Sequence, residues 1–109
     1  MYQDEVVLCA SSAYTKKYYL NEDFNLLPED VKKELKAMCV LFTEEVGGTL
    51  TLSFDEDGRL ELRTEAEEQD LLYDEIGSVL KIKQLRREKA ELFEALESFF
   101  GVFFLGEGE

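Results

Sequence analysis

The sequence has no histidine and no tryptophan, and only one proline and two cysteines among its 109 residues. Without histidine, the common catalytic dyads and triads cannot be assembled, and zinc and copper sites lose a principal ligand. No glycine-rich phosphate-binding motif is present either. We therefore predict no catalytic residue, no metal site and no cofactor. Acid–base chemistry by paired carboxylates stays open as an enzymatic alternative, because the chain has 25 acidic residues.

Positive charge is also scarce, since 12 basic residues face 25 acidic ones and the net charge is −13. This balance disfavours binding to nucleic acid or to an anionic membrane surface. No segment approaches the roughly 20 apolar residues of a membrane span. Asp4 and Glu5 stand where a secretory signal needs positive charge. We expect a cytoplasmic protein with no nucleic-acid partner and no membrane partner.

Length and composition predict one folded domain over residues 1–109, because 45% of the residues are apolar and the acids are interleaved with periodic leucine, valine and phenylalanine. Cys9 and Cys39 are expected to be reduced in the cytoplasm and to fill the core as small apolar groups. A single disulfide between them is the alternative.

Two strands are predicted near the N-terminus, over Val6–Ala10 and Thr15–Leu20, with Ser11–Ala13 near the turn. A helix is predicted over residues 28–46. Pro28 suits a first helical position, and Gly47 and Gly48 end the helix. Its middle, residues 37–42, is apolar all round, which predicts a central helix covered by other elements.

The segments 49–54 and 59–64 alternate apolar and polar residues, which predicts a β-hairpin. A three-residue loop at 56–58 pairs Phe54 with Leu60 and Leu52 with Leu62, so that one face stays apolar. A two-residue turn would mix the two faces. The acidic loop, residues 55–58, resembles the start of a calcium site, but the ligand spacing is absent and a tight turn explains it.

The rest of the chain reads as helical from Leu71, after a polar connection at 65–70 that could instead be a first helical turn. Two apolar faces point in nearly opposite directions: Leu72, Ile76, Val79 and Leu80 form one, and Leu85, Leu92, Leu96, Phe99 and Phe103 form the other. We therefore predict a bend between Gly77 and Arg86. A strand at 79–85 is the alternative. Lys89, Glu91, Glu94 and Glu97 are predicted to be solvated.

Two clusters are candidate interface residues. The first is basic and contains Lys81, Lys83, Arg86 and Arg87. It is either a solvated face paired with nearby acids or a docking patch for an acidic partner or a second copy. The second contains Phe99, Phe100, Phe103 and Phe104. It indicates either a deeply buried helix or a contact with another subunit.

Several segments resemble one known family. They are 37–44 (Ala-Met-Cys-Val-Leu-Phe-Thr-Glu), 46–48 (Val-Gly-Gly), 54–55 (Phe-Asp), 74–78 (Asp-Glu-Ile-Gly-Ser) and 80–85 (Leu-Lys-Ile-Lys-Gln-Leu). Together they resemble an uncharacterised family of small acidic proteins from anaerobic Gram-positive bacteria, a domain of unknown function. The resemblance covers about residues 6–105 and implies a bacterial cytoplasmic protein. It implies no activity, cofactor or site residue.

The fold class predicted is α+β: an antiparallel sheet of about four strands in the order ββαββα, packed by a central helix and a bent C-terminal helical segment. The sheet face with Leu50, Leu52, Phe54, Leu60 and Leu62 should pack against Leu35, Phe42, Leu92 and Leu96.

The function predicted is a noncatalytic protein-interaction or adaptor domain, which binds a protein partner or a second copy of itself. A small secretion-type chaperone is one specific form, on the analogy of size, acidity and element order. The alternative is a small-molecule binder or small enzyme that uses carboxylates and the tyrosines Tyr14, Tyr18, Tyr19 and Tyr73.

Overall fold

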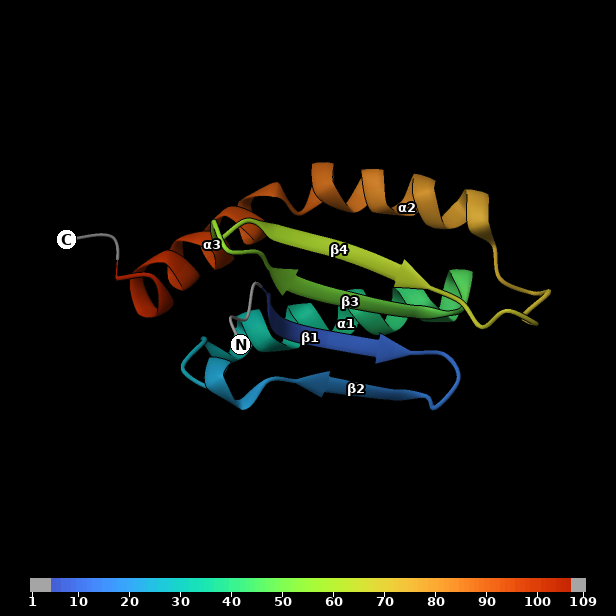
Figure 1. The fold of residues 1–109 in the computed structure, drawn as a ribbon, viewed down its shortest axis with the longest axis horizontal. Coiled ribbons are helices and arrows are strands. Elements are labelled where there is room, and N and C mark those ends of the chain that lie inside the picture. The colour runs from blue at the N-terminus through green and yellow to red at the C-terminus, as the bar shows by residue number, and fades with distance from the viewer. Residues whose placement is uncertain (1–4, 107–109) are drawn as a thin grey trace.

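The computed structural model describes residues 5–106 and shows the predicted α+β fold (Figure 1). The elements are β1 (Val6–Ser12), β2 (Lys17–Leu20), a 3₁₀ turn η1 (Glu22–Phe24), α1 (Glu29–Val46), β3 (Thr49–Phe54), β4 (Leu60–Glu65), α2 (Glu75–Glu88) and α3 (Ala90–Phe104). The C-terminal helical segment is therefore two helices.

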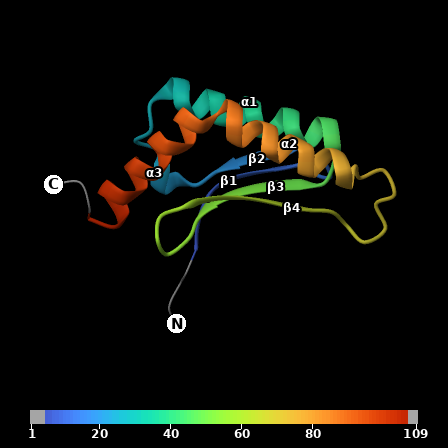
Figure 2. The ribbon, with the colours of Figure 1, turned by 90° about the horizontal axis from the view of Figure 1, so that it is seen from above.

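The strands within this range form one antiparallel sheet in the order β2-β1-β3-β4. Helices α1 and α2 lie side by side on one face of this sheet (Figure 2). The opposite face is polar: Ser53 pairs with Glu61 across it, and Thr51 pairs with Arg63. The fold is thus a two-layer structure in which the second sheet face is polar.

The predicted register of the second hairpin is confirmed. Phe54 lies opposite Leu60 and Leu52 opposite Leu62. The Asp55 N–H donates to the Arg59 carbonyl at 3.0 Å, and Gly58 takes a positive φ of +84° in the turn. The Asp55 carboxylate accepts from the Asp57 and Arg59 N–H groups, each at 2.9 Å. The acidic loop is therefore a hairpin turn capped by its own first aspartate.

The first hairpin differs from prediction at its turn. Ser11 and Ser12 belong to strand β1, and β2 begins only at Lys17. The Ser12 hydroxyl accepts from the Tyr14 and Thr15 N–H groups, so it caps the turn from the strand end. Hydroxyl capping of this kind lets a polar residue end a strand.

Helix α1 matches the prediction apart from two details. Pro28 lies one residue before the helix with extended ψ of 151°, as its N-cap. The helix ends at Val46, where Gly47 and Gly48 both have positive φ. Its apolar middle is only half covered: Met38, Cys39 and Phe42 are buried, whereas Leu41 is exposed. One face of α1 packs on the sheet and the other faces solvent, because the fold has two layers.

The predicted bend lies further along the chain than expected. Helix α2 continues through the predicted interval to Glu88, and the break falls at Lys89. Residues 79–85 are helical, so the strand alternative is wrong. The helix begins at Glu75 instead of Leu71, because the Asp74 carboxylate caps it by accepting from the Gly77 N–H at 2.8 Å.

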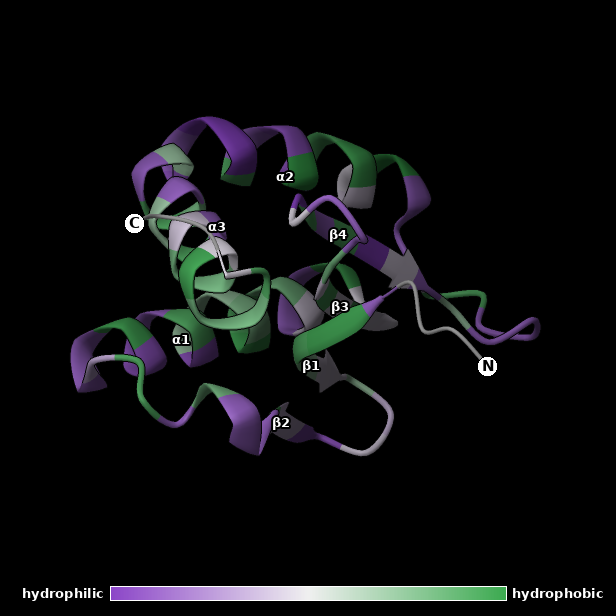
Figure 3. Ribbon diagram, turned by 60° about the vertical axis from the view of Figure 1, so that its left-hand side comes forward, coloured by the Kyte–Doolittle hydropathy of each residue, from purple (hydrophilic) through white to green (hydrophobic). Residues whose placement is uncertain are grey.

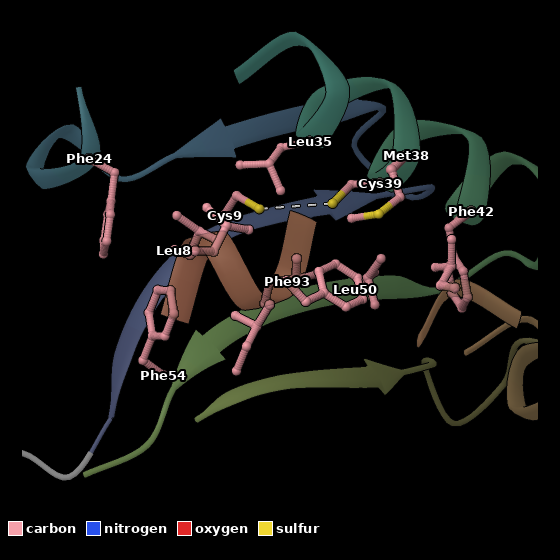
Figure 4. Packing of buried hydrophobic residues seen from close by; sticks show 14 of the residues in the cluster. Leu8, Cys9, Phe24, Leu35, Met38, Cys39, Phe42, Leu50, Phe54 and Phe93 are labelled. Carbon is pink, nitrogen blue, oxygen red and sulfur yellow. Dashed lines mark hydrogen bonds between the residues drawn. The ribbon is translucent and has the colours of Figure 1, made fainter. Parts of the chain in front are cut away.

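The core lies between the sheet and the helices (Figure 4). Leu50, Leu52, Phe54 and Leu60 of the sheet are buried as predicted, and Leu62 is partly buried. Leu35, Phe42 and Leu96 are the predicted helix residues that are buried, while Leu92 is only partly buried. Helix α3 is rotated from the prediction. It buries Phe93, Leu96 and Phe100, leaves Phe99 half-buried and exposes Phe103.

Cys9 and Cys39 are free thiols buried between β1 and α1, with their sulfurs 3.9 Å apart (Figure 4). The Cys9 hydrogen bond and burial both raise the pKa of Cys39 far above its ordinary value. The two residues fill the core as predicted. Over residues 5–106, no helix has the length and apolar content needed to cross a bilayer.

Candidate interaction surface

The outer face of α2 and the turn before it expose five large apolar side chains. We call them the α2 face: Leu71, Leu72, Ile76, Val79 and Leu80. Their exposed fractions range from 54% at Val79 to 94% at Leu71. Figure 3 shows the first half of α2 as hydrophobic ribbon at the edge of the molecule. These residues form the most exposed apolar group on any described helix and its adjoining turn.

The inner side of the same helix is partly polar. Ser78 is buried, and its hydroxyl accepts from Tyr73 at 2.8 Å and lies 3.4 Å from the Thr64 hydroxyl of β4. Lys81 forms a 2.5 Å ion pair with Glu45 of α1. The Asp74 N–H donates to the Val46 carbonyl. Polar contacts therefore hold the start of α2 in place, and its aliphatic side faces water.

The position of the helix break explains this orientation. A bend between residues 77 and 86 would have let both apolar faces reach the core. Because α2 is straight to Glu88, burying Leu85 at its end turns Ile76, Val79 and Leu80 outward. The sequence pattern showed the two opposed faces, and the late break decides which one is left in solvent.

The four basic candidates divide into two pairs. Lys81 is engaged with Glu45, and the Arg86 guanidinium donates to the Leu60 carbonyl at the edge of the sheet at 3.3 Å. Lys83 and Arg87 are exposed and form no ion pair with any residue in the described range. Only this second pair is free to meet a partner.

The phenylalanine candidates are brought together in one aromatic cluster. Phe100 is buried and stacks on Phe54, and Phe104 stacks on Phe24 with ring centroids 4.9 Å apart. Phe99 stacks on Phe103 at 4.5 Å. Phe103 is exposed, as are its neighbours Val102 and Leu105. Phe100 therefore belongs to the core, and the exposed part of this cluster is the outer side of the end of α3.

Two residues that were predicted to be solvated instead form contacts within the fold. Glu97 accepts a hydrogen bond from the Leu60 N–H at 2.8 Å, and Lys89 pairs with Glu34 of α1 at 2.9 Å. Glu91 and Glu94 are exposed as predicted. The contacts of Glu97 and Lys89 were not visible in the sequence, because both partners lie more than 30 residues away.

The four tyrosines of the alternative function do not share a pocket. The Tyr14 hydroxyl donates to Asp70 at 2.6 Å, which raises the pKa of Tyr14, and Tyr73 donates to Ser78. Tyr19 is exposed. The Tyr18 hydroxyl is buried without a hydrogen bond of ordinary geometry to any described residue. Burial is the larger cause that raises the pKa of Tyr18, and the adjacent Cys9 is the second.

A half-open cavity of about 320 Å³ lies between the first hairpin and α1. Lys16, Lys17 and Lys36 line it together with one acid, Glu44, and with Ser11, Tyr18 and Thr43. None of the three lysine side chains forms an ion pair or hydrogen bond with another described residue. Sequence reasoning missed this group, because Lys36 lies about 20 residues from the other two. Within residues 5–106, no three potential metal ligands of the His, Cys, Asp or Glu type gather at one point.

Comparison with known proteins identifies the family of this chain but gives no activity for it. No curated protein and no solved structure matches the chain. A model of one protein family matches residues 5–108, which is nearly the whole sequence. The chain therefore belongs to DUF6145, a family of unknown function.

Proposed function

We propose that this chain is a noncatalytic protein-interaction domain and that it binds through the α2 face. The observation that carries the proposal is the outward orientation of the five aliphatic side chains of this face. Full burial of one such side chain is worth about 1.5–3 kcal/mol, so leaving five in water forgoes a large stabilisation. A partner surface that covers them recovers that free energy.

The fold does not require apolar residues at these positions. Helix α2 is held by Tyr73, Ser78, Lys81 and Leu85 on its inner side, and polar residues could occupy the outer side without loss of packing. A helix that only covered the sheet would be expected to carry charges outward. The aliphatic outer side therefore supports a binding role.

An adaptor role draws on a second exposed apolar group at the other end of the molecule. Val102, Phe103 and Leu105 lie at the end of α3, and Figure 1 shows this end far from the start of α2 along the 48 Å long axis. Two separated apolar surfaces suit a protein that contacts two partners. We propose that it acts in the cytoplasm of an anaerobic Gram-positive bacterium, as the family resemblance implied.

The test is site-specific photocrosslinking in the native cells. A photoreactive phenylalanine analogue replaces Ile76 in one version and Leu26 in the control. Both side chains are 76% exposed, but Leu26 lies outside the α2 face. We expect a crosslinked protein product from position 76 and none from position 26. Equal yields at the two positions, or no product at 76, would contradict the proposal.

The second candidate function is binding of a small organic anion in the lysine-lined cavity. Three lysines that form no ion pair with a residue in 5–106 lie around one hollow, which is unusual in a chain with net charge −13. The Tyr18 ring and Val40 supply apolar lining, and Ser11 and Thr43 supply hydroxyls. The alternative function predicted from the sequence was a small-molecule binder that used carboxylates and tyrosines. The present candidate uses lysines in place of the carboxylates and retains one of those tyrosines, Tyr18.

NMR titration of ¹⁵N-labelled protein with benzoate or inorganic phosphate tests this candidate. Saturable shifts confined to the residues around the cavity would support it, and the Lys36→Gln variant should weaken them. Shifts spread over the surface, or shifts unchanged in that variant, would count against it.

A further inference from the structure

We infer that the partner on the α2 face is a second copy of this chain, with the two α2 helices antiparallel across a two-fold axis. This inference rests on the proposed function, because it names the occupant of the same surface. Two observations carry it: the order of charges along the helix, and the absence of partners for Glu75, Lys83 and Arg87 among the described residues.

The exposed side of α2 changes character along its length. Glu75 lies at its start, Ile76, Val79 and Leu80 lie in its middle, and Lys83 and Arg87 lie near its end. At 100° per residue, Ile76, Val79, Leu80, Lys83 and Arg87 share one side of the helix. The face therefore has an aliphatic centre and a basic end, and the acidic Glu75 flanks its start.

This order is self-complementary in one direction only. In a two-fold pair centred on Val79, positions equally distant from the centre face each other. Lys83 of one copy then faces Glu75 of the partner subunit. A parallel pair would place acids against acids and bases against bases. Charge complementarity therefore selects the antiparallel arrangement.

The charges that this arrangement uses are available. Lys83, Arg87 and Glu75 are exposed and form no ion pair or side-chain hydrogen bond with another residue in the described range. Lys81 and Lys89 on the same segment instead pair with Glu45 and Glu34 of α1. The basic residues that point toward α1 are thus satisfied within the subunit, and those on the outer side are left for a partner.

The size of the face sets the expected affinity. Helix α2 has 14 residues, so it is about 21 Å long and presents a strip about 10 Å wide. A stable complex usually buries about 800 Å² on each partner, and this strip is smaller. We therefore expect a reversible dimer with a Kd on the order of 1–100 μM.

Sedimentation equilibrium of the purified chain, from below to well above that concentration range, tests the inference. The wild-type mass should rise from 12.6 kDa toward twice that value. Lys83→Glu and Glu75→Lys should each raise the Kd about tenfold, because each places like charges together twice in the symmetric pair. The double variant should restore dimerisation, since the pair of charges is exchanged.

Lys33→Glu is the control for the change in net charge. Lys33 is exposed on α1 and forms no ion pair with a described residue, so this variant should dimerise like the wild type. Circular dichroism and urea unfolding confirm that each variant is folded.

The outcomes separate this inference from the proposed function. A wild-type chain that stays monomeric at the highest concentration overturns the dimer. Single variants without effect, or a double variant that is not restored, overturn it as well. If the chain is monomeric but position 76 crosslinks to a different protein in cells, the proposed function stands without the dimer. If neither association is found, both fail.

Discussion

The phenyl rings of Phe54 and Phe100 stack with their centroids 4.3 Å apart and their planes only 8° from parallel. This contact joins the end of β3 to α3, which are more than 40 residues apart in the chain. Phe24 stacks on the same Phe54 at 5.7 Å, so the segment before α1 meets the same cluster. Three distant parts of the chain are therefore held together by one aromatic stack.

Replacing Phe100 with alanine should lower the free energy of unfolding by about 3–5 kcal/mol, because it leaves a cavity under the hairpin turn. Phe103→Ala is the matched control on the same helix. Phe103 is exposed, so that change should cost about 1 kcal/mol or less in the monomer. Urea unfolding at low protein concentration measures both. Equal losses would contradict the burial difference.

The two glycines after α1 should differ in their tolerance of a methyl group. Both have positive φ, of +85° at Gly47 and +70° at Gly48. A Cβ at Gly47 would meet nothing closer than 3.8 Å, whereas one at Gly48 would lie 2.5 Å from the Glu65 carbonyl oxygen. Gly47→Ala should cost about 1–3 kcal/mol from backbone strain alone.

Gly48→Ala should cost clearly more than Gly47→Ala, because the strand or the Tyr73 ring must move as well. Thermal unfolding of the two variants, side by side, measures the difference. If the Gly48→Ala variant is as stable as the Gly47→Ala variant, the backbone of β4 at Glu65 can shift away from the new methyl group at little cost in free energy.

Glu97 satisfies the backbone at the edge of the sheet, since it accepts from the Leu60 N–H. Glu97→Ala removes the acceptor from a partly buried donor and should destabilise the fold by about 1–3 kcal/mol. Glu94→Ala, one turn earlier on the exposed side of α3, should change stability by about 0.5 kcal/mol or less. Hydrogen exchange at the Leu60 amide gives a local measurement, and it should accelerate only in Glu97→Ala.

Glu5 should give the fold a pH-dependent contribution on the acid side. Its carboxylate accepts from the buried Ser53 hydroxyl and from the Arg63 guanidinium, and these bonds hold the pKa of Glu5 below its ordinary value. Because the folded-state pKa is the lower one, the contribution is present above the unfolded-state pKa. It is lost as the pH falls through the folded-state pKa.

The Glu5→Gln variant should therefore be less stable than the wild type at pH 7, and the difference should shrink as the pH falls through the folded-state pKa of Glu5. Urea unfolding across this range measures it. Glu61→Gln on the same sheet face is the control, since Glu61 forms no ion pair or hydrogen bond with a described side chain. If the difference in free energy of unfolding between Glu5→Gln and the wild type does not change with pH, the effect of the substitution comes from packing and not from the charge of Glu5.

Local patterns in the sequence were sufficient for most of the elements and for one register. The alternation over residues 49–54 and 59–64 has a period of two, so only one pairing keeps Leu52 and Phe54 on a dry face with Leu60 and Leu62. The glycines at 47 and 48 ended α1 because few other residues adopt positive φ. Such signals act over a few residues, and they do not depend on contacts with distant parts of the chain.

Tertiary structure alone decided the rotation of each C-terminal helix and hence the candidate site. The pattern showed that Ile76 and Leu85 point in opposite directions, but the break at Lys89 determined which of them reached the core. It also decided that Phe100 is buried and Phe103 is not. The rotation of a helix about its axis depends on contacts with distant residues, such as Thr64, Leu60 and Phe54, and these contacts leave no periodic trace in the sequence.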